Sequence, residues 1–401
     1  MTTLHKSLKR KQQKHVEMLA KVEKTSARLD RRKSKLGALE TSIAELERRV
    51  AEPGQGRGAN GEVGQGVRRA QLIFNPASGK DVSNNALRLS QIISSLHAHG
   101  IEASIGFKTS GKAARALAKD AVRDGLPLVI VAAGDGTISD VASQLIGTAT
   151  VLGVVPIGTM NNIARSLGVP LEIDDACALI GMGTTRHIDV GRLRSNQSKH
   201  DEHFLECAGV GLAAIGALAG QAFEKRHWRA LPRVLQRFFQ AKLGTMRIEL
   251  DGTEIQASTR IVTVSNAPLM GNNMLAAPDA KMDDGYLDVS VYDGMGDAEL
   301  VGHFHAASAH TPNELKSYRA KRVRITTEDS VLASSGGDIA PARHIVEIEI
   351  VPAALSMIVG NGIGLTIPVE SAPAAPTYAA DPPSHNGAAK DDTTQPAPAH
   401  S

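Results

Sequence analysis

Two short loops, each directly after an apolar run, hold residues that are well suited to bind an anion. The loop at 134–137 reads Gly-Asp-Gly-Thr, and the loop at 158–161 reads Gly-Thr-Met-Asn. Each predicts a buried strand that ends in a tight turn and the first turn of a helix. Glycine lets a ligand come close to the backbone, and the free N–H groups at the start of a helix favour an anion. The two loops together therefore predict a site for a nucleotide polyphosphate.

Four further segments agree with the two loops in type and in order along the chain. They are Leu72–Gly79, Phe204–Gly211, Ala277–Asp288 and Ile350–Leu355. Together with the loops, these segments resemble the diacylglycerol kinase catalytic family, which includes bacterial lipid kinases and the sphingosine and ceramide kinases. The resemblance extends over residues 71–368. It implies an ATP-dependent kinase that transfers the γ-phosphoryl group to a lipid hydroxyl, diacylglycerol-like or sphingoid.

The resemblance assigns nucleotide-binding roles to residues that follow the predicted strands. In the first loop, backbone N–H groups and Thr137 hold phosphate oxygens, and Asp135 faces the nucleotide or its magnesium. The residues that match the nucleotide site of the family are Asn75, Thr109, Gly134, Asp135, Gly136, Thr137, Gly158, Thr159 and Asn161. Two positions depart from the family pattern, because Ala133 stands where glycine is more common and Asn162 replaces an aspartate. ATP and Mg²⁺ are the cofactors that the resemblance implies.

A second set of residues concerns a structural metal ion. The segment from Lys281 to Tyr286 matches one in which bacterial members of the family bind a divalent ion. The resemblance assigns a carboxylate ligand to Asp284 and backbone carbonyl ligands to Lys281 and Tyr286. Oxygen ligands of this kind suit magnesium or calcium. The alternative interpretation is an acidic turn before the predicted strand at Leu287.

The catalytic base is the part of the site that the sequence defines least. Phosphoryl transfer to a hydroxyl needs in-line geometry, magnesium and usually a carboxylate near the attacking oxygen. The family places this carboxylate in an Asp-Gly-Glu motif, whereas the matching stretch here, 331–339, contains Asp338 as its only carboxylate. Asp338 is therefore the candidate base, and the alternative is that it serves as a polar turn residue.

Alternating strands and helices must position these loops. Strand candidates are 71–75, 103–109, 128–132 and 151–156, and helix candidates are 84–99, 112–124 and 137–145. Apolar strands between helices predict a parallel sheet that binds ligands beyond its carboxyl ends. After about residue 189, short alternating runs predict a mostly antiparallel β domain. The predicted fold class is α/β, with an NAD kinase-like nucleotide-binding domain followed by that β domain.

Charge and composition divide the chain further. Residues 1–50 carry 14 Lys or Arg against 6 Asp or Glu, and their apolar spacing is typical of a helical coiled coil. Two interpretations of this arm stay open, a solvated helix with a short self-association stripe and a basic arm attracted to anionic lipid. The predicted domains are 1–50 for this arm, 51–67 for a flexible linker, 68–188 for the kinase domain, 189–369 for the β-rich domain and 370–401 for a disordered tail.

The remaining features concern location and partners. The chain has two cysteines and no apolar run of about 20 residues, which favours a cytoplasmic protein that is peripheral at the membrane. The segment 224–242 holds the only Trp among several cations, and it predicts a membrane-interface helix or a helix packed on the second domain. We expect a lipid substrate at a membrane surface and self-association through the coiled coil, and no nucleic acid. The alternatives are a catalytically weakened regulator that binds nucleotide and membrane, and a kinase with a soluble acceptor.

Overall fold

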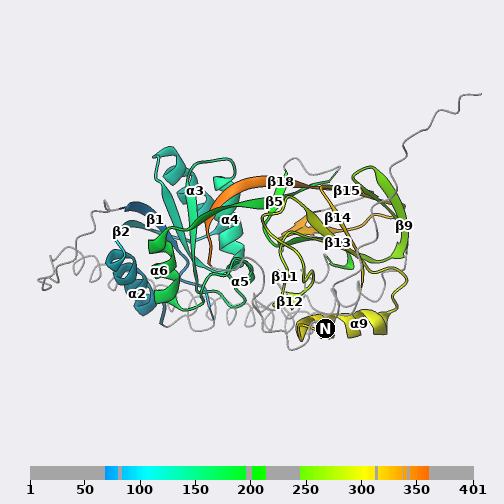
Figure 1. Ribbon diagram of the computed structural model, residues 1–401, viewed down its shortest axis with the longest axis horizontal. Helices are drawn as coiled ribbons and strands as arrows, with labels where there is room; N and C mark the ends of the chain where they lie inside the picture. Colours follow the sequence, from blue (N-terminus) through cyan, green and yellow to red (C-terminus); the bar gives the residue numbers. More distant parts are fainter. Residues whose placement is uncertain are drawn as a thin grey trace, which may run out of the picture.

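The computed structural model describes residues 68–79, 84–195, 201–213, 244–311, 315–336, 338–340 and 344–360. These residues form two lobes, which are joined by the long strands β5 (Thr185–Ser195) and β18 (Ile345–Ile358) (Figure 1). The two strands pair with each other over most of their length. The predicted coiled-coil arm, the linker, the segment 224–242 and the C-terminal tail lie outside the described residues.

The first lobe is a parallel sheet with helices on both faces. Its strands are β1 (Arg68–Phe74), β2 (Ile101–Phe107), β3 (Leu128–Ala133) and β4 (Val151–Pro156), in the order β2-β1-β3-β4. Its helices are α2 (Asn85–Ala98), α3 (Gly111–Arg123), α4 (Asp135–Leu145), α5 (Asn162–Ser166) and α6 (Ile173–Met182). Helix α2 packs against α6 and α3 packs against α4, which places one pair on each face of the sheet.

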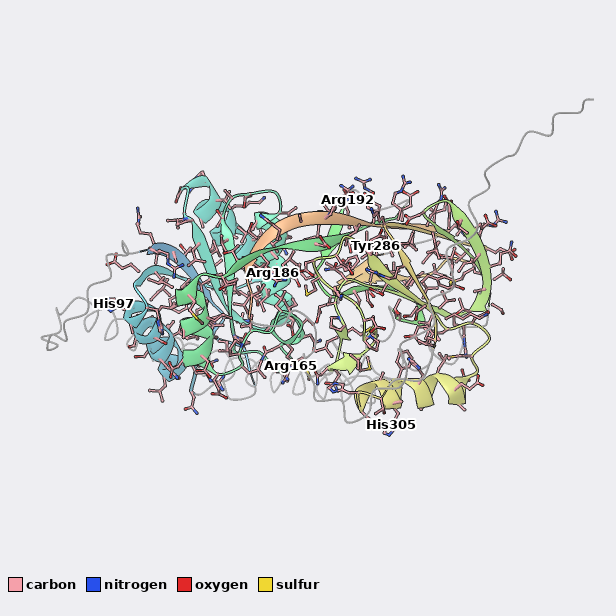
Figure 2. The ribbon with its side chains drawn as sticks, in the orientation of Figure 1. His97, Arg165, Arg186, Arg192, Tyr286 and His305 are labelled. Carbon is pink, nitrogen blue, oxygen red and sulfur yellow. The ribbon has the colours of Figure 1, made fainter. Side chains whose placement is uncertain are left out.

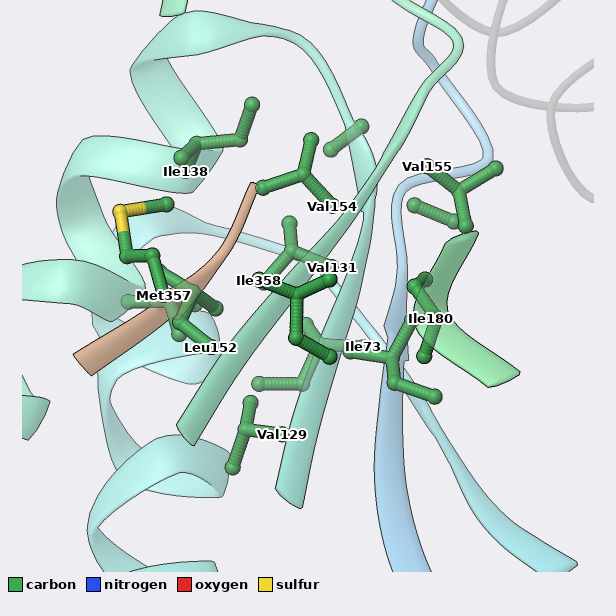
Figure 3. Packing of buried hydrophobic residues seen from close by; sticks show 14 of the residues in the cluster. Ile73, Val129, Val131, Ile138, Leu152, Val154, Val155, Ile180, Met357 and Ile358 are labelled. Carbon is green, nitrogen blue, oxygen red and sulfur yellow. The ribbon is translucent and has the colours of Figure 1, made fainter. Parts of the chain in front are cut away.

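The central strands are apolar because helices cover both of their faces. All six residues of β3 are buried, and so are residues 152–156 of β4. Val131 and Leu152 belong to the same core cluster as Met357 and Ile358 of β18 (Figure 3). Continuous burial is typical of parallel strands. It leaves the ends of the strands as the places where this sheet can present polar groups.

Strand β18 makes one sheet out of both lobes. Near its end it pairs parallel with β4, through Met357 and Leu152, and its first residues pair antiparallel with β15 (Arg322–Thr327). The sheet has ten strands, and its other members are β6 (Glu202–Phe204), β8 (Gly244–Leu250) and β9 (Thr253–Thr259). The predicted boundary between residues 188 and 189 therefore falls inside β5, which both lobes share.

A bulge in β18, between Val351 and Leu355, marks the passage between the lobes. Within it, Ala353 has a φ of 50°, in the left-handed region. The buried Asp189 carboxylate accepts hydrogen bonds from Ala353 N at 2.7 Å and from Gly285 N at 2.6 Å. Burial raises the pKa of Asp189, and these two N–H groups oppose the shift. Asp189 therefore ties the bulge to a loop of the second lobe.

The second lobe adds an antiparallel sheet that packs on the shared sheet. Its order is β14-β13-β10-β7-β16-β17. The strands are β7 (Cys207–Gly211), β10 (Ile261–Ser265), β13 (Leu287–Val291), β14 (Lys316–Ala320), β16 (Ala333–Ser335) and β17 (Asp338–Ala340). A short hairpin, β11 (Leu269–Met270) with β12 (Met274–Leu275), and helix α9 (Asp297–Ser308) complete the lobe. The predicted fold class, a parallel-sheet domain before a mostly antiparallel β domain, is confirmed.

Candidate functional site

The predicted nucleotide-binding residues meet at one edge of the parallel sheet. Strand β1 is the point where the sheet order reverses, because β2 lies on one side of it and β3 on the other. Ligands of such sheets bind beyond the carboxyl ends of the strands at this switch point. Asn75 follows β1, Thr109 lies two residues beyond β2, and the two glycine loops follow β3 and β4. The fold thus collects all four loops at the position expected for a nucleotide.

The two glycine loops touch each other at Gly134 and Gly158. A Cβ atom built on Gly158 would lie 2.6 Å from Asn161 Oδ1 and would also collide with Gly134 Cα. A Cβ atom built on Gly134 would lie 3.2 Å from Gly158 Cα. A side chain on Gly158 would therefore displace both the Asn161 amide and the backbone of Gly134, and one on Gly134 would press on the backbone of Gly158. These two glycines are therefore needed to bring the loops together, whether or not a ligand is present.

Asn161 closes the second loop. Its Oδ1 accepts a hydrogen bond from Gly158 N at 2.9 Å, and its Nδ2 donates to Gly158 O at 3.3 Å. The residue has a φ of 55° and a ψ of 41°, a left-handed conformation that asparagine tolerates better than most residues. Asn161 thus shapes the turn before α5, and its side chain is engaged within the loop itself.

The carboxylate of Asp135 is directed at the start of α5. Its Oδ1 accepts a hydrogen bond from Ile163 N at 3.0 Å, and N–H groups of Asn161 and Asn162 also contribute. Burial raises the pKa of Asp135, and these N–H groups oppose that shift. An anion at a helix N-terminus is stabilising. In the described conformation, Asp135 thus couples the first glycine loop to the second, and a direct role on the nucleotide stays a prediction.

Thr137 receives two donors from neighbouring strand ends. Lys108 Nζ donates to Thr137 Oγ1 at 2.7 Å, and Asn75 Nδ2 lies 3.4 Å from the same oxygen. Asn75 Oδ1 in turn accepts a hydrogen bond from Ala77 N at 3.1 Å. Lys108 is absent from the set predicted from the sequence. The available signal was a cation near the end of the predicted strand 103–109, directly before Thr109.

The other members of the predicted set differ in exposure. Gly136, Thr159 and Thr109 are exposed, so a ligand can reach them. Ala133, by contrast, is fully buried in the core cluster of the parallel sheet. Its methyl group therefore packs in the core and does not project into the loop that follows.

The candidate base lies on a hairpin that approaches the first lobe. Asp338 is the first residue of β17 and pairs with Ser335 of β16. In the turn between these strands, a Cβ atom built on Gly336 would lie 4.0 Å from Ser139 Oγ of α4. The hairpin thus reaches the helix that begins with the first glycine loop. A catalytic role for Asp338 stays a prediction.

The predicted metal segment is held by arginine. Asp284 pairs with Arg319 and also accepts a hydrogen bond from Tyr286 N at 3.1 Å. The Arg319 guanidinium lies 4.0 Å from Asp288 and 4.7 Å from the centre of the Tyr286 ring. Lys281 is exposed. Among the described residues, no group of three or more His, Cys, Asp or Glu side chains is arranged to hold a metal ion. A metal site made of the Asp284 carboxylate and the backbone carbonyls of Lys281 and Tyr286 is a different donor set, and it stays a prediction.

Asp288 carries a strongly shifted carboxyl group beside this segment. Burial raises its pKa to about 6, and Arg319 opposes the shift. Its β13 position places it inside the second lobe and away from the glycine loops. The shift is therefore relevant to stability more than to phosphoryl transfer.

A hollow among the described residues lies away from the glycine loops. It has a volume of about 310 Å³ and is lined by charged residues on the outer side of β5, β8, β15 and β18. Figure 2 shows Arg192 on this side of the joining strands. Arg192 pairs with Glu349, Arg194 with Asp201, and Arg324 with Glu347. Because cations and carboxylates alternate across the strands, their charges compensate one another. We therefore interpret this hollow as part of the sheet surface and not as a ligand site.

Comparisons with known proteins agree with this architecture. The family model of the diacylglycerol kinase catalytic domain matches residues 69–193, and that of the YegS C-terminal NAD kinase beta sandwich-like domain matches residues 218–359. A diacylglycerol kinase of Bacillus subtilis (strain 168) is 27% identical over 288 residues, which are 68% of this chain and 90% of the relative. A diacylglycerol kinase of Mycobacterium tuberculosis (strain H37Rv) is 28% identical over 307 residues, covering 73% and 95% of the two chains. A crystal structure of a diacylglycerol kinase from Bacillus anthracis str. Sterne has a TM-score of 0.57 at 22% identity, and it covers 74% of this chain and 98% of that one, which shows a common fold.

Proposed function

Because this chain belongs to the diacylglycerol kinase catalytic domain family, we propose that it is an ATP-dependent kinase that transfers the γ-phosphoryl group to a lipid hydroxyl. The acceptor class is diacylglycerol-like or sphingoid. The observation that carries the proposal is the convergence of Asn75, Thr137 and the two glycine loops at the switch point of the parallel sheet. The names of the relatives support the choice of a lipid acceptor.

The first lobe supplies the groups for the nucleotide. The start of α4 presents backbone N–H groups and the exposed Gly136 to the phosphates, and the exposed Thr159 and Thr109 border the same space. ATP enters as its magnesium complex, in which the ion neutralises phosphate charge. The described carboxylates near the loops are already engaged, Asp135 by N–H groups and Asp140 by Arg115. We therefore infer that the phosphates, rather than a protein cage, carry the magnesium ion.

The second lobe supplies the acceptor side of the site. The β16–β17 hairpin approaches α4 at Gly336, and Asp338 is the first residue of β17. We propose that the Asp338 carboxylate receives the proton of the lipid hydroxyl as the oxygen attacks the γ-phosphorus. The bond between this phosphorus and the bridging oxygen of ADP then breaks. The products are ADP and a phosphorylated lipid.

A catalytically weakened regulator is the alternative function. The absence of an Asp-Gly-Glu sequence in 331–339 favours it. A methyl group at Ala133 that crowded the phosphates would also favour it, but this methyl group is buried in the core of the parallel sheet. The question of activity thus depends on the hairpin around Asp338.

The proposal is tested by transfer of labelled γ-phosphate from ATP·Mg²⁺ to diacylglycerol, monoacylglycerol and sphingoid bases in mixed micelles. We expect incorporation with one acceptor class, and we expect Asp338→Ala to abolish turnover while ATP still binds in calorimetry. Binding of ATP without incorporation by the wild type would instead support the regulator. Turnover with a soluble acceptor and no lipid surface would contradict the lipid assignment.

The membrane is proposed as the place where the acceptor is met. No helix in the part of the chain that the structure describes is both long and apolar enough to span a bilayer. We propose peripheral attachment at a cytoplasmic surface because cations gather in the basic arm and in the segment 224–242, which also holds the Trp. Flotation with anionic vesicles tests it, and truncation of residues 1–50 distinguishes the two segments.

A further inference from the structure

Lys108 lies at the nucleotide edge of the sheet without an assigned role. It is the first residue after β2, and its backbone N–H donates to Phe74 O at 2.8 Å, which fixes its place beside β1. Its side chain is 20% exposed, so the ammonium is largely enclosed. A half-buried lysine gives up hydration, and a structure keeps such a charge where an anionic partner compensates it.

The hydrogen bonds of Thr137 indicate what that partner is. A threonine hydroxyl has one proton to donate and two lone pairs to accept. Lys108 Nζ and Asn75 Nδ2 both donate to Thr137 Oγ1, so both lone pairs are used. No acceptor for its proton is found among the described residues, although Thr137 is only 3% exposed. The Thr137 hydroxyl and the Lys108 ammonium are therefore two adjacent hydrogen-bond donors in a place with few protein acceptors.

The carboxylate of Asp140 does not form a close ion pair with Lys108. Asp140 Oδ2 lies 4.0 Å from Lys108 Nζ, at the outer limit for an ion pair, whereas Asp140 Oδ1 is in direct contact with Arg115. Burial lowers the pKa of Lys108, the Asp140 charge opposes this, and the Arg115 charge adds to it. Asp140 therefore pairs mainly with Arg115, and the Lys108 ammonium donates to Thr137.

We propose that Lys108 and Thr137 together hold a phosphate group of the bound ATP, with Lys108 supplying the positive charge that the glycine loops lack. The inference deepens the proposed kinase function and rests on it. The start of α4 offers N–H dipoles but no full charge. A lysine ammonium within reach of the same loop supplies a charge-assisted hydrogen bond to phosphate.

The test is calorimetric titration of the full chain with ATP·Mg²⁺ and, separately, with adenosine. We expect Lys108→Met to weaken ATP binding by about 10- to 100-fold, as expected for the loss of a charge-assisted hydrogen bond, with adenosine affinity unchanged. Lys119→Met, which removes an exposed lysine of α3, is the matched control and should leave both affinities as they are. Lys108→Arg should retain most of the ATP affinity.

A second variant guards against an effect on folding. Thr137→Val removes the hydroxyl at nearly constant volume, and Thr137→Ser keeps it. We expect Thr137→Val to weaken ATP but not adenosine binding, and the double variant with Lys108→Met to lose less than the sum of the two effects, because both donors serve one phosphate. Melting temperatures of all variants separate binding from stability.

The outcomes distinguish this inference from the proposed function. A wild type that binds neither ATP nor adenosine overturns the nucleotide site itself. A wild type that binds ATP, together with a Lys108→Met variant of equal ATP affinity, overturns only the role of Lys108. If Lys108→Met loses ATP and adenosine binding equally and has a lower melting temperature, the role of Lys108 is purely structural. That result would also overturn the proposed phosphate contact.

Discussion

Gly136 is the glycine of the first loop that the ligand-free fold does not require. It lies in the first turn of α4, its φ is not in the left-handed region, and a Cβ atom built on it would meet nothing within 4 Å. Glycine inside a helix costs about 0.5 to 1 kcal/mol relative to alanine. The sequence thus retains a destabilising residue where the protein alone would accept a side chain.

We therefore predict opposite effects of Gly136→Ala on stability and on binding. The substitution should raise the free energy of unfolding by about 0.5 to 1 kcal/mol, which corresponds to roughly 1 to 4 °C in melting temperature for a domain of 150–250 residues. It should weaken ATP binding by about tenfold or more, because a methyl group would occupy the space in which a phosphate approaches the backbone N–H groups.

Gly158→Ala is the matched comparison. Its Cβ would collide with Gly134 Cα and lie 2.6 Å from Asn161 Oδ1, so backbone must move. Overpacking of this kind costs about 1 to 3 kcal/mol. This variant should therefore lose stability and ATP affinity together, whereas Gly136→Ala loses affinity alone.

Differential scanning calorimetry and titration calorimetry of the same two preparations decide the matter. A more stable Gly136→Ala variant with weaker ATP binding supports a phosphate at the start of α4. A Gly136→Ala variant that binds ATP as the wild type does would refute the reasoning, because the added methyl group then meets no ligand. A loss of stability in Gly136→Ala would show that a protein group occupies the space.

Three further predictions concern charged groups. Asp135→Ala should lower the free energy of unfolding by about 1 to 2 kcal/mol in denaturant titrations, because the carboxylate caps α5, and unchanged stability would contradict that role. The free energy of unfolding should fall by up to about 3 kcal/mol as pH rises from about 4 to 6, since the folded state holds the proton of Asp288 up to a pKa of about 6, and Asp288→Asn should flatten this slope. A chelator should leave the melting temperature of the ligand-free wild type unchanged, because Arg319 pairs with Asp284. Arg319→Ala should make the melting temperature respond to added Ca²⁺ or Mg²⁺. A wild type whose melting temperature falls in the chelator would instead support the metal ion predicted from the sequence.

The local elements of the first lobe could be predicted from the sequence because their signals are local. The bounds of β4 agree with the predicted strand, and β1 begins at residue 68 instead of 71. Apolar runs of four to six residues between helical patterns are enough to indicate parallel strands. The carboxyl edge of the sheet, and hence the place of the glycine loops, follows from that pattern alone.

The joining of the lobes could not be predicted in the same way. The pairing of Met357 with Leu152 connects residues that are far apart in sequence, and no periodicity reports such a register. The alternating pattern at 345–351 predicts a strand, but β18 continues to Ile358 through a bulge at Pro352 and Ala353. A proline and a left-handed residue normally indicate the end of a strand. Here the buried Asp189 carboxylate stabilises the irregularity, and only the folded chain brings it there.

The structure shows that several residues of the two glycine loops have a structural role, so their presence in a sequence does not by itself indicate nucleotide binding. Gly134 and Gly158 are required by the contact between the loops, Asn161 closes its own turn, and Asp135 caps α5. A relative that had lost all activity would still need these residues in order to fold. We predict that two other positions report on a nucleotide. They are the exposed Gly136, where a side chain would meet nothing, and Lys108, whose ammonium contacts the Thr137 hydroxyl. A relative that no longer binds nucleotide is free to replace Gly136, because glycine inside a helix lowers its stability. Their joint presence at one edge of the sheet therefore favours a site that still binds polyphosphate, and the Asp338→Ala variant tests the separate prediction that Asp338 is the catalytic base.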